Sequence, residues 1–539
     1  MCAVTPDVVG AYEGLLGGEL EPALEARTIL QQERGPAAQA WLALFDAAIG
    51  FAAPELAPLP LEAEALAASL KGHPEAIPPG TRAAVHALRR AVLSFDLARA
   101  TAAHRAILGL CRGADPESMA WAAVADAWIA ILAGAPVGGA LEAATREGQV
   151  AQRPELVLEA SALRALSTAE RGDISGALAI ARRASRMART ESLPQSEYLA
   201  NLVLARIRRL DNKPHLATRI LHALYSVAPS PWLPWLAWEI VLATGALPVL
   251  PPTTPGSAAP YALEALLARA WAGDRPGFDR TARAAVEHTQ RLAPLAADLR
   301  RCLQAIDPEI SPAELEPELA AWALGNTAEP PLGVIGLAKD SGAPGEPVAW
   351  VWAPADRAGR RVLSPGVALA RARSGAEEPV PSDNKQLRTD SAIAALALVG
   401  RAGIAEEALF HKLYGFTYEP ERHLSVRDVL YLRVRRRAQP ATLEREGGRV
   451  WLAHERPLLV PDPRSSPVAE IRILRVLAER RTAAPKEVAA ELGISVRTAQ
   501  DALSRLAEDG AVRKEKARLG LQYILEDTTF SEPTRNIRR

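Results

Sequence analysis

The side chains of this 539-residue chain that are best suited to chemistry lie in its last fifty residues. Hydroxyl, guanidinium and amide groups recur there at helical spacing, in Ser495, Arg497, Thr498, Gln500, Ser504 and Arg505. Arginine and glutamine can each form paired hydrogen bonds with the edges of guanine and adenine. An alternating stretch follows, and its cations Lys514, Lys516 and Arg518 suit contacts with phosphate. These residue types predict a surface that binds double-stranded DNA.

Three helices and a hairpin are predicted to position these side chains. A first helix is expected over 468–481, and a second over 485–492 that ends at Gly493. The Ser495 hydroxyl can cap a third helix. The inner face of this third helix is predicted to comprise Val496, Ala499, Leu503 and Leu506. The alternating stretches AVRKEK and LQYILE then predict a β-hairpin with a basic tip.

Helix, helix, turn, helix and hairpin follow one another in the order of a winged helix-turn-helix. The stretch LGISVRTAQDALSRLAEDGAV resembles the recognition segment of GntR- and MarR-type bacterial repressors. This resemblance covers 461–527 and implies that the third helix enters the major groove of DNA. The alternative is a module that binds proteins, since Asp501 and Glu515 dilute its basic face.

A second arginine-rich helix is predicted just upstream, in 389–460. Helices are expected over 391–399, 404–414 and 424–437, followed by a hairpin in TLEREGGRVWLA. This order resembles the OmpR-type winged helix, and VLYLRVRRR resembles its recognition helix. The resemblance assigns DNA contacts to Arg427, Arg433, Arg435, Arg436 and Arg437.

The predicted rotation of that helix leaves its role open. Its inner face is predicted to comprise Val426, Val429 and Val434, which leaves Leu430 and Leu432 exposed. Two leucines depart from the polar face that base reading requires, so this helix either contacts phosphate or packs on a neighbouring domain. Between Arg422 and Arg449 there are eight arginines and three acids, an excess that suits phosphate.

The segment 326–388 is predicted to be a small β-element or linker. Residues 348–352 and 360–363 read as a hairpin, and OmpR-type domains carry a small antiparallel sheet before their first helix. Residues 528–539 are predicted to be a disordered tail.

Residues 1–325 are rich in alanine, leucine, arginine and glutamate, which favour helices. A weak repeat places Ala23, Ala63, Ala100, Ala140, Ala177 and Ala217 at intervals of 40, 37, 40, 37 and 40 residues. The pattern resembles tetratricopeptide-like repeats and predicts stacked helical hairpins that bind a protein or peptide. The alternative is a helical bundle without repeats. The apolar stretch 231–250 contains prolines and an acid, which favours a buried helical hairpin over a membrane span.

Composition narrows the function classes. The formal net charge is zero, so binding of nucleic acid must rely on local clusters of arginine and lysine. Three scattered cysteines and an N-terminus without signal-peptide features favour a reducing cytoplasm. The sequence has no phosphate-binding glycine loop, zinc-ligand spacing or acid–base set, so no cofactor, metal or catalytic residue is expected.

The chain is therefore expected to be mainly α-helical, with a solenoid-like N-terminal repeat followed by two α/β winged helices. We expect a cytoplasmic transcriptional regulator rather than an enzyme, and its layout resembles large bacterial activators with repeat sensor regions. A protein-interaction scaffold is the main alternative, and an enzyme acting on nucleic acid is a weaker one. The sequence leaves a homodimer open.

Overall fold

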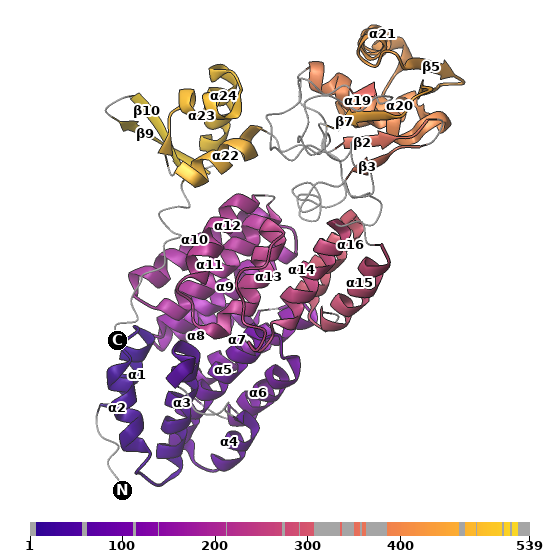
Figure 1. Cartoon of the computed structure of the whole chain (residues 1–539). Helices are drawn as coiled ribbons and strands as arrows, with labels where there is room; N and C mark the ends of the chain where they lie inside the picture. The colour runs from indigo at the N-terminus through magenta and orange to yellow at the C-terminus, as the bar shows by residue number, and fades with distance from the viewer. Residues whose placement is uncertain are drawn as a thin grey trace.

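The computed structural model describes most of the chain (Figure 1). The described residues are 7–56, 62–111, 115–137, 139–211, 213–271, 275–289, 291–306, 335–336, 350–355, 358–362, 385–462, 469–480, 482–508, 511–517 and 520–525. We distinguish a helical array (7–306), a middle module (335–461) and a C-terminal module (469–525). Cys2, Arg518 and the predicted tail at 528–539 lie outside the described residues.

The helical array accounts for most of the described chain. Its α-helices are α1 (Val8–Leu16), α2 (Glu21–Leu30), α3 (Pro36–Ala52), α4 (Ala63–Ser69), α5 (Ile77–Leu93), α6 (Leu97–Leu110), α7 (Pro116–Ala133), α8 (Ala140–Val150), α9 (Pro154–Glu170), α10 (Ile174–Thr190), α11 (Pro194–Leu210), α12 (Pro214–Tyr225), α13 (Leu233–Thr244), α14 (Ala258–Trp271), α15 (Arg275–Thr289) and α16 (Ala293–Ile306). Several begin with proline in the first turn, where its missing N–H leaves no hydrogen bond unmade. Asp115 caps α7 and Asp173 caps α10, each accepting a hydrogen bond from a backbone N–H group.

The six alanines of the predicted repeat fall in α2, α4, α6, α8, α10 and α12, so each repeat is a helix pair. All are buried except Ala140, which is half-buried. The helices between them in the chain are α3, α5, α7, α9 and α11. Each of these packs against the helix that follows it in the chain. The prediction of a mainly helical fold is confirmed, and this packing is that of stacked helical hairpins.

The array curves back on itself, so that distant repeats touch. The rings of Phe51 in α3 and Trp232 in the short helix η3 (Ser230–Trp232) lie 5.5 Å apart. The apolar stretch 231–250 contains the end of η3 and one α-helix, α13, so its predicted burial is confirmed but the predicted hairpin of two helices is wrong. Its tryptophans fill the centre of the array, and prolines prevent a second helix there. No described helix is long and apolar enough to cross a membrane.

A buried ionic cluster joins α11, α13 and α16. Arg206 Nη1 donates to Asp298 Oδ2 over 2.6 Å and to Glu239 Oε1 over 2.8 Å. Arg209 Nε donates to the second oxygen of Glu239 over 2.6 Å, and Trp238 Nε1 donates to Asp298 Oδ2 over 3.2 Å. All four charged side chains are at most 1% exposed, so their mutual pairing is what makes their burial tolerable.

The described residues of the middle module form two small sheets and three α-helices. The first sheet has the order β1-β7-β2-β3, and its strands are β1 (Ile335–Gly336), β2 (Trp350–Ala353), β3 (Arg360–Val362) and β7 (Leu458–Pro461). The second sheet has the order β4-β6-β5, and its strands are β4 (Ile404–Ala405), β5 (Thr442–Glu446) and β6 (Arg449–Ala453). The helices are α19 (Lys385–Val399), α20 (Glu406–Tyr414) and α21 (Pro420–Arg437). β2 pairs antiparallel with β3, as the sequence predicts.

Three boundaries in this module differ from the sequence expectation. Ile404–Ala405, expected to begin a helix, forms β4 instead, and α20 begins at Glu406. α19 begins at Lys385 rather than Ser391, and its later residues pack against β2 and β7. α21 begins at Pro420 rather than Leu424, because proline is favoured in a first helical turn. The β5–β6 turn places Gly447 and Gly448 at φ of 56° and 76°, the left-handed region that a two-residue hairpin turn requires.

The C-terminal module has three helices and a three-stranded sheet. Its elements are α22 (Ala469–Arg480), β8 (Thr482–Ala483), α23 (Pro485–Leu492), α24 (Val496–Glu508), β9 (Val512–Ala517) and β10 (Gly520–Leu525). β10 lies between β8 and β9 in the sheet. α22 packs against α12 of the array, and Leu216 of α12 belongs to the buried cluster of this module. Figure 1 shows α24 on the side of the module that faces away from the array.

Candidate nucleic-acid interface

Local signals position α24 largely as the sequence predicts. Gly493 ends α23 at φ of 61°, a left-handed conformation that glycine adopts without strain. Ser495 Oγ accepts a hydrogen bond from the Thr498 backbone N–H over 3.0 Å and caps the next helix. The buried face of α24 consists of Ala499, Ala502, Leu503 and Leu506. Val496, predicted to be buried, is 39% exposed, because the first turn of the helix extends beyond the core.

The outward face of α24 presents Arg497, Thr498, Gln500 and Asp501, all of them exposed. Among the described residues, Arg497 and Gln500 have no hydrogen-bond or ion-pair partner in the protein. Thr498 Oγ1 lies 2.8 Å from Ser495 Oγ, so both hydroxyls are engaged in the cap. Arg497 and Gln500 are thus free to meet a ligand and are suited to paired contacts with purines, whereas Asp501, equally exposed and without a partner among the described residues, is an acid.

The remaining predicted residues of α24 are less available. Ser504 is half-buried. Arg505 Nε donates to Oε1 of Glu470 in α22 over 2.7 Å, although its side chain is still 59% exposed. This partner cannot be predicted from the sequence, because no spacing rule connects residues on two different helices.

The β9–β10 hairpin carries the predicted cations. Lys514 and Lys516 are exposed and alternate along β9, so they share one face of the hairpin. The Lys514 ammonium lies 6.0 Å from the centre of the Tyr523 ring, within reach of a cation–π interaction. These two amines form a positive edge beside α24.

The C-terminal module thus combines a capped third helix, which carries an unpaired arginine and glutamine, with a basic hairpin beside it. Residues 469–513 match the family of winged helix-turn-helix DNA-binding domains. A comparison with curated proteins and one with solved structures each found no match. The matched residues cover α22, α23 and α24 and reach the start of β9, so the match includes every element of this interface except most of the β9–β10 hairpin.

In the middle module, the predicted rotation of α21 is partly wrong. Leu430 is 2% exposed rather than exposed, and Val429 is 45% exposed rather than buried. Val434 is buried and Leu432 is 46% exposed, as predicted. The neighbouring Tyr431 explains the rotation, because its hydroxyl donates to Glu406 Oε1 over 2.8 Å in the interior. The inner stripe therefore follows the spacing of four residues rather than three.

Most of the arginines around α21 already have partners. Arg427 donates to Asp428 over 2.9 Å, and Arg437 Nε donates to Asp390 over 3.1 Å. Arg445 pairs with Glu406, and Arg449 donates to backbone carbonyls. Most of the positive charges counted in the sequence therefore form ion pairs or hydrogen bonds within the module.

Arg435 and Arg436 are the exposed cations left at the end of α21, and neither has an ion pair among the described residues. Arg433 is half-buried near Tyr414. The same outer face carries Leu424, Leu432 and Val429, each at least 45% exposed. α21 therefore presents a mixed face with two free guanidiniums, which suits phosphate better than base edges.

Proposed function

We propose that the protein is a DNA-binding transcriptional regulator that acts by binding and not by catalysis. The supporting observation is the pair of exposed, unpartnered side chains Arg497 and Gln500 on α24, within residues that match a DNA-binding family. In this proposal α24 lies in the major groove, as in GntR- and MarR-like proteins, and reads purines through these two side chains. Lys514 and Lys516 of the wing neutralise phosphates.

The middle module would act as a second, OmpR-type winged helix. Its order of sheet, three helices and hairpin supports this, since a small sheet before the first helix is what the resemblance implies. Arg435 and Arg436 would contact phosphate and add affinity with little sequence preference. The exposed leucines of α21 favour the rival function, a scaffold whose modules bind proteins.

The helical array would recruit or sense a protein or peptide, as tetratricopeptide-like repeats do. Two observations support this proposal: the alanine repeat at intervals of 40 and 37 residues, and the stacking of consecutive helix pairs in the array. We further propose a cytoplasmic bacterial protein, consistent with its sparse cysteines and the resemblance to bacterial regulators. A homodimer would present two copies of α24 to a two-fold symmetric site.

The test is fluorescence anisotropy of the full chain with labelled random duplex across a salt series. We expect binding that weakens steeply with salt, because each neutralised phosphate contributes about 0.9 to the slope of log affinity against log salt. Arg497→Ala should weaken binding, whereas Arg34→Ala, at an exposed arginine of the array, should not. If the full chain binds no duplex at about 50 mM salt, the scaffold replaces this proposal.

A further inference from the structure

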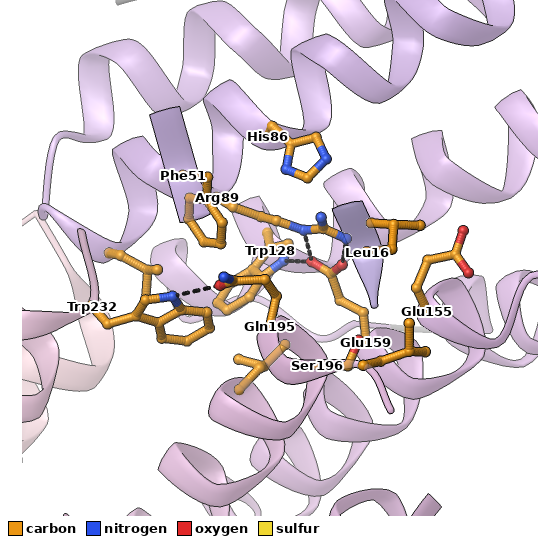
Figure 2. Close-up of a pocket in the computed structure, with 13 residues that line it drawn as sticks. Leu16, Phe51, His86, Arg89, Trp128, Glu155, Glu159, Gln195, Ser196 and Trp232 are labelled. Carbon is orange, nitrogen blue, oxygen red and sulfur yellow. Dashed lines mark hydrogen bonds and ion pairs between the residues drawn. The ribbon is translucent and has the colours of Figure 1, made fainter. Parts of the chain in front are cut away.

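A cavity lies inside the helical array, between the row formed by α3, α5, α7, α9 and α11 and the short helix η3. The cavity has a volume of about 30 Å³ at its narrow core and opens to solvent, the whole open space measuring about 530 Å³. The interior of the cavity is therefore narrow, and it can hold an unbranched chain better than a ring or a branched group. Figure 2 shows its walls, which include Phe51, Arg89, Trp128, Glu155, Glu159 and Trp232.

The aromatic walls offer ring surfaces rather than hydrogen bonds. Trp128 Nε1 donates to Glu159 Oε1 over 2.7 Å, and Trp232 Nε1 donates to Gln195 Oε1 over 2.9 Å. Both indole N–H groups are thus occupied within the protein. What remains for a ligand is apolar contact and the negative face of the rings, which attracts cations.

The arginines near the cavity are already paired with acids. Arg89 donates to both oxygens of Glu159. Arg82 donates to Glu117 over 2.7 Å, and Arg153 donates to the same carboxylate over 3.1 Å. Burial lowers the pKa of His86, with Arg89 and Arg82 lowering it further, so this ring is neutral. An anionic ligand would therefore find no unpaired cation among the described lining residues.

Glu155 is the unpaired charge. Its side chain is 6% exposed, and its Oε1 has no hydrogen-bond partner among the described residues. Burial raises the pKa of this carboxyl, while Arg153 and Arg82 oppose the rise. A buried carboxylate oxygen that no protein group satisfies is costly unless a donor reaches it. An ammonium group would supply the missing hydrogen bond.

We propose that this cavity is a binding site for a slender aliphatic amine, with its ammonium on the free oxygen of Glu155 and its chain along the rings of Trp128 and Trp232. Figure 2 shows Glu155 and Trp232 on opposite sides of the Arg89–Glu159 pair, so the ligand must be elongated. The same chemistry can come from a free alkylamine or from a lysine side chain of a peptide. The site does not depend on DNA binding.

The test is isothermal titration calorimetry of the full chain with n-hexylamine, n-hexanol and hexanoate, together with the fluorescence of the wall tryptophans. The amine should bind, the alcohol should bind about tenfold more weakly and the acid should not bind, since only the ammonium adds an opposite charge to its hydrogen bond with the carboxylate. Glu155→Gln should weaken amine binding about tenfold. Glu142→Gln, at an exposed glutamate of α8, should leave it unchanged.

A second variant guards against misfolding, and the thermal unfolding of each variant is measured alongside. Ser196→Phe, at a half-buried lining position, should obstruct the cavity without touching Glu155 and should abolish amine binding. Tighter binding of N-acetyl-lysine amide than of n-hexylamine would identify a peptide as the source, and the reverse a free amine. Equal binding of hexanoate, no binding of either amine, or amine binding that survives both Glu155→Gln and Ser196→Phe would overturn the proposal.

Discussion

Arg505 of α24 is held by Glu470 of α22, its Nε donating to the carboxylate Oε1 over 2.7 Å. Arg497 lies about two helical turns earlier on the same helix and has no such partner among the described residues. To reach a base edge, Arg505 must give up an ion pair, whereas Arg497 gives up only water. The two arginines should therefore differ in what they contribute to DNA binding.

Arg497→Ala should cost about 1–3 kcal/mol of binding free energy on a preferred DNA site and relax discrimination at one base pair. Arg505→Ala should cost less binding free energy. In the wild-type protein, any contact of Arg505 with DNA is offset by the loss of its ion pair with Glu470. Anisotropy titrations with a selected site and its single-base variants measure both. A larger loss for Arg505→Ala, or a uniform loss across sequences for Arg497→Ala, would contradict this assignment.

Replacing both Arg435 and Arg436 by alanine should weaken binding to all duplex sequences about equally. Because each removes one phosphate contact, the slope of log affinity against log salt should fall by about two units. The same titrations at several salt concentrations measure the slope. A double Arg34→Ala/Arg146→Ala variant changes the net charge equally at exposed positions of the array and should leave the slope unchanged. A change in sequence preference would instead mean that α21 reads bases.

Asp298→Asn should destabilise the array by roughly 3–5 kcal/mol, because it removes one of the two buried carboxylates that Arg206 and Arg209 share and leaves Glu239 as the other. Burial alone would raise the pKa of Asp298, but Arg206, Arg209 and Arg301 hold it below its ordinary value. Its stabilising effect is therefore fully present well above the unfolded pKa of about 3.9 and is lost progressively as the pH falls from there toward the lower pKa of the folded state.

Urea denaturation between neutral pH and about pH 3 checks this prediction. The wild-type chain should lose more free energy of unfolding over that interval than Asp298→Asn does, since the variant lacks the titrating group. Equal losses would show that other carboxyls dominate the acid transition.

Leu216→Ala should loosen the contact between the array and the C-terminal winged helix. Leu216 is 2% exposed and shares a buried cluster with residues of α22, and core Leu→Ala changes cost roughly 2–5 kcal/mol. Hydrogen exchange followed by mass spectrometry should show faster exchange in Ala469–Arg480. Leu108→Ala, at a residue of α6 that is 41% exposed, is the control. Unchanged protection of α22 would mean that this contact contributes little.

The amino-acid sequence by itself determined where the helices and turns of the winged helices begin and end. Gly493, Ser495 and the glycine pair at 447–448 act within a few residues, through backbone conformation and capping, so their effects can be predicted without a fold. The order of helices and hairpin in the C-terminal module follows from the same local signals, and the family match agrees with it.

Tertiary structure decided the rotation of α21, the partner of Arg505 and the cavity around Glu155. Apolar spacing allowed either Val429 or Leu430 on the inner face, and the choice followed from Tyr431 reaching Glu406 on another helix. Glu470 and Arg505 are 35 residues apart, and the cavity gathers residues from across the array. The spacing of apolar residues predicts contacts only between residues three or four positions apart on one helix. Ion pairs and cavities instead depend on which elements lie side by side in the folded protein.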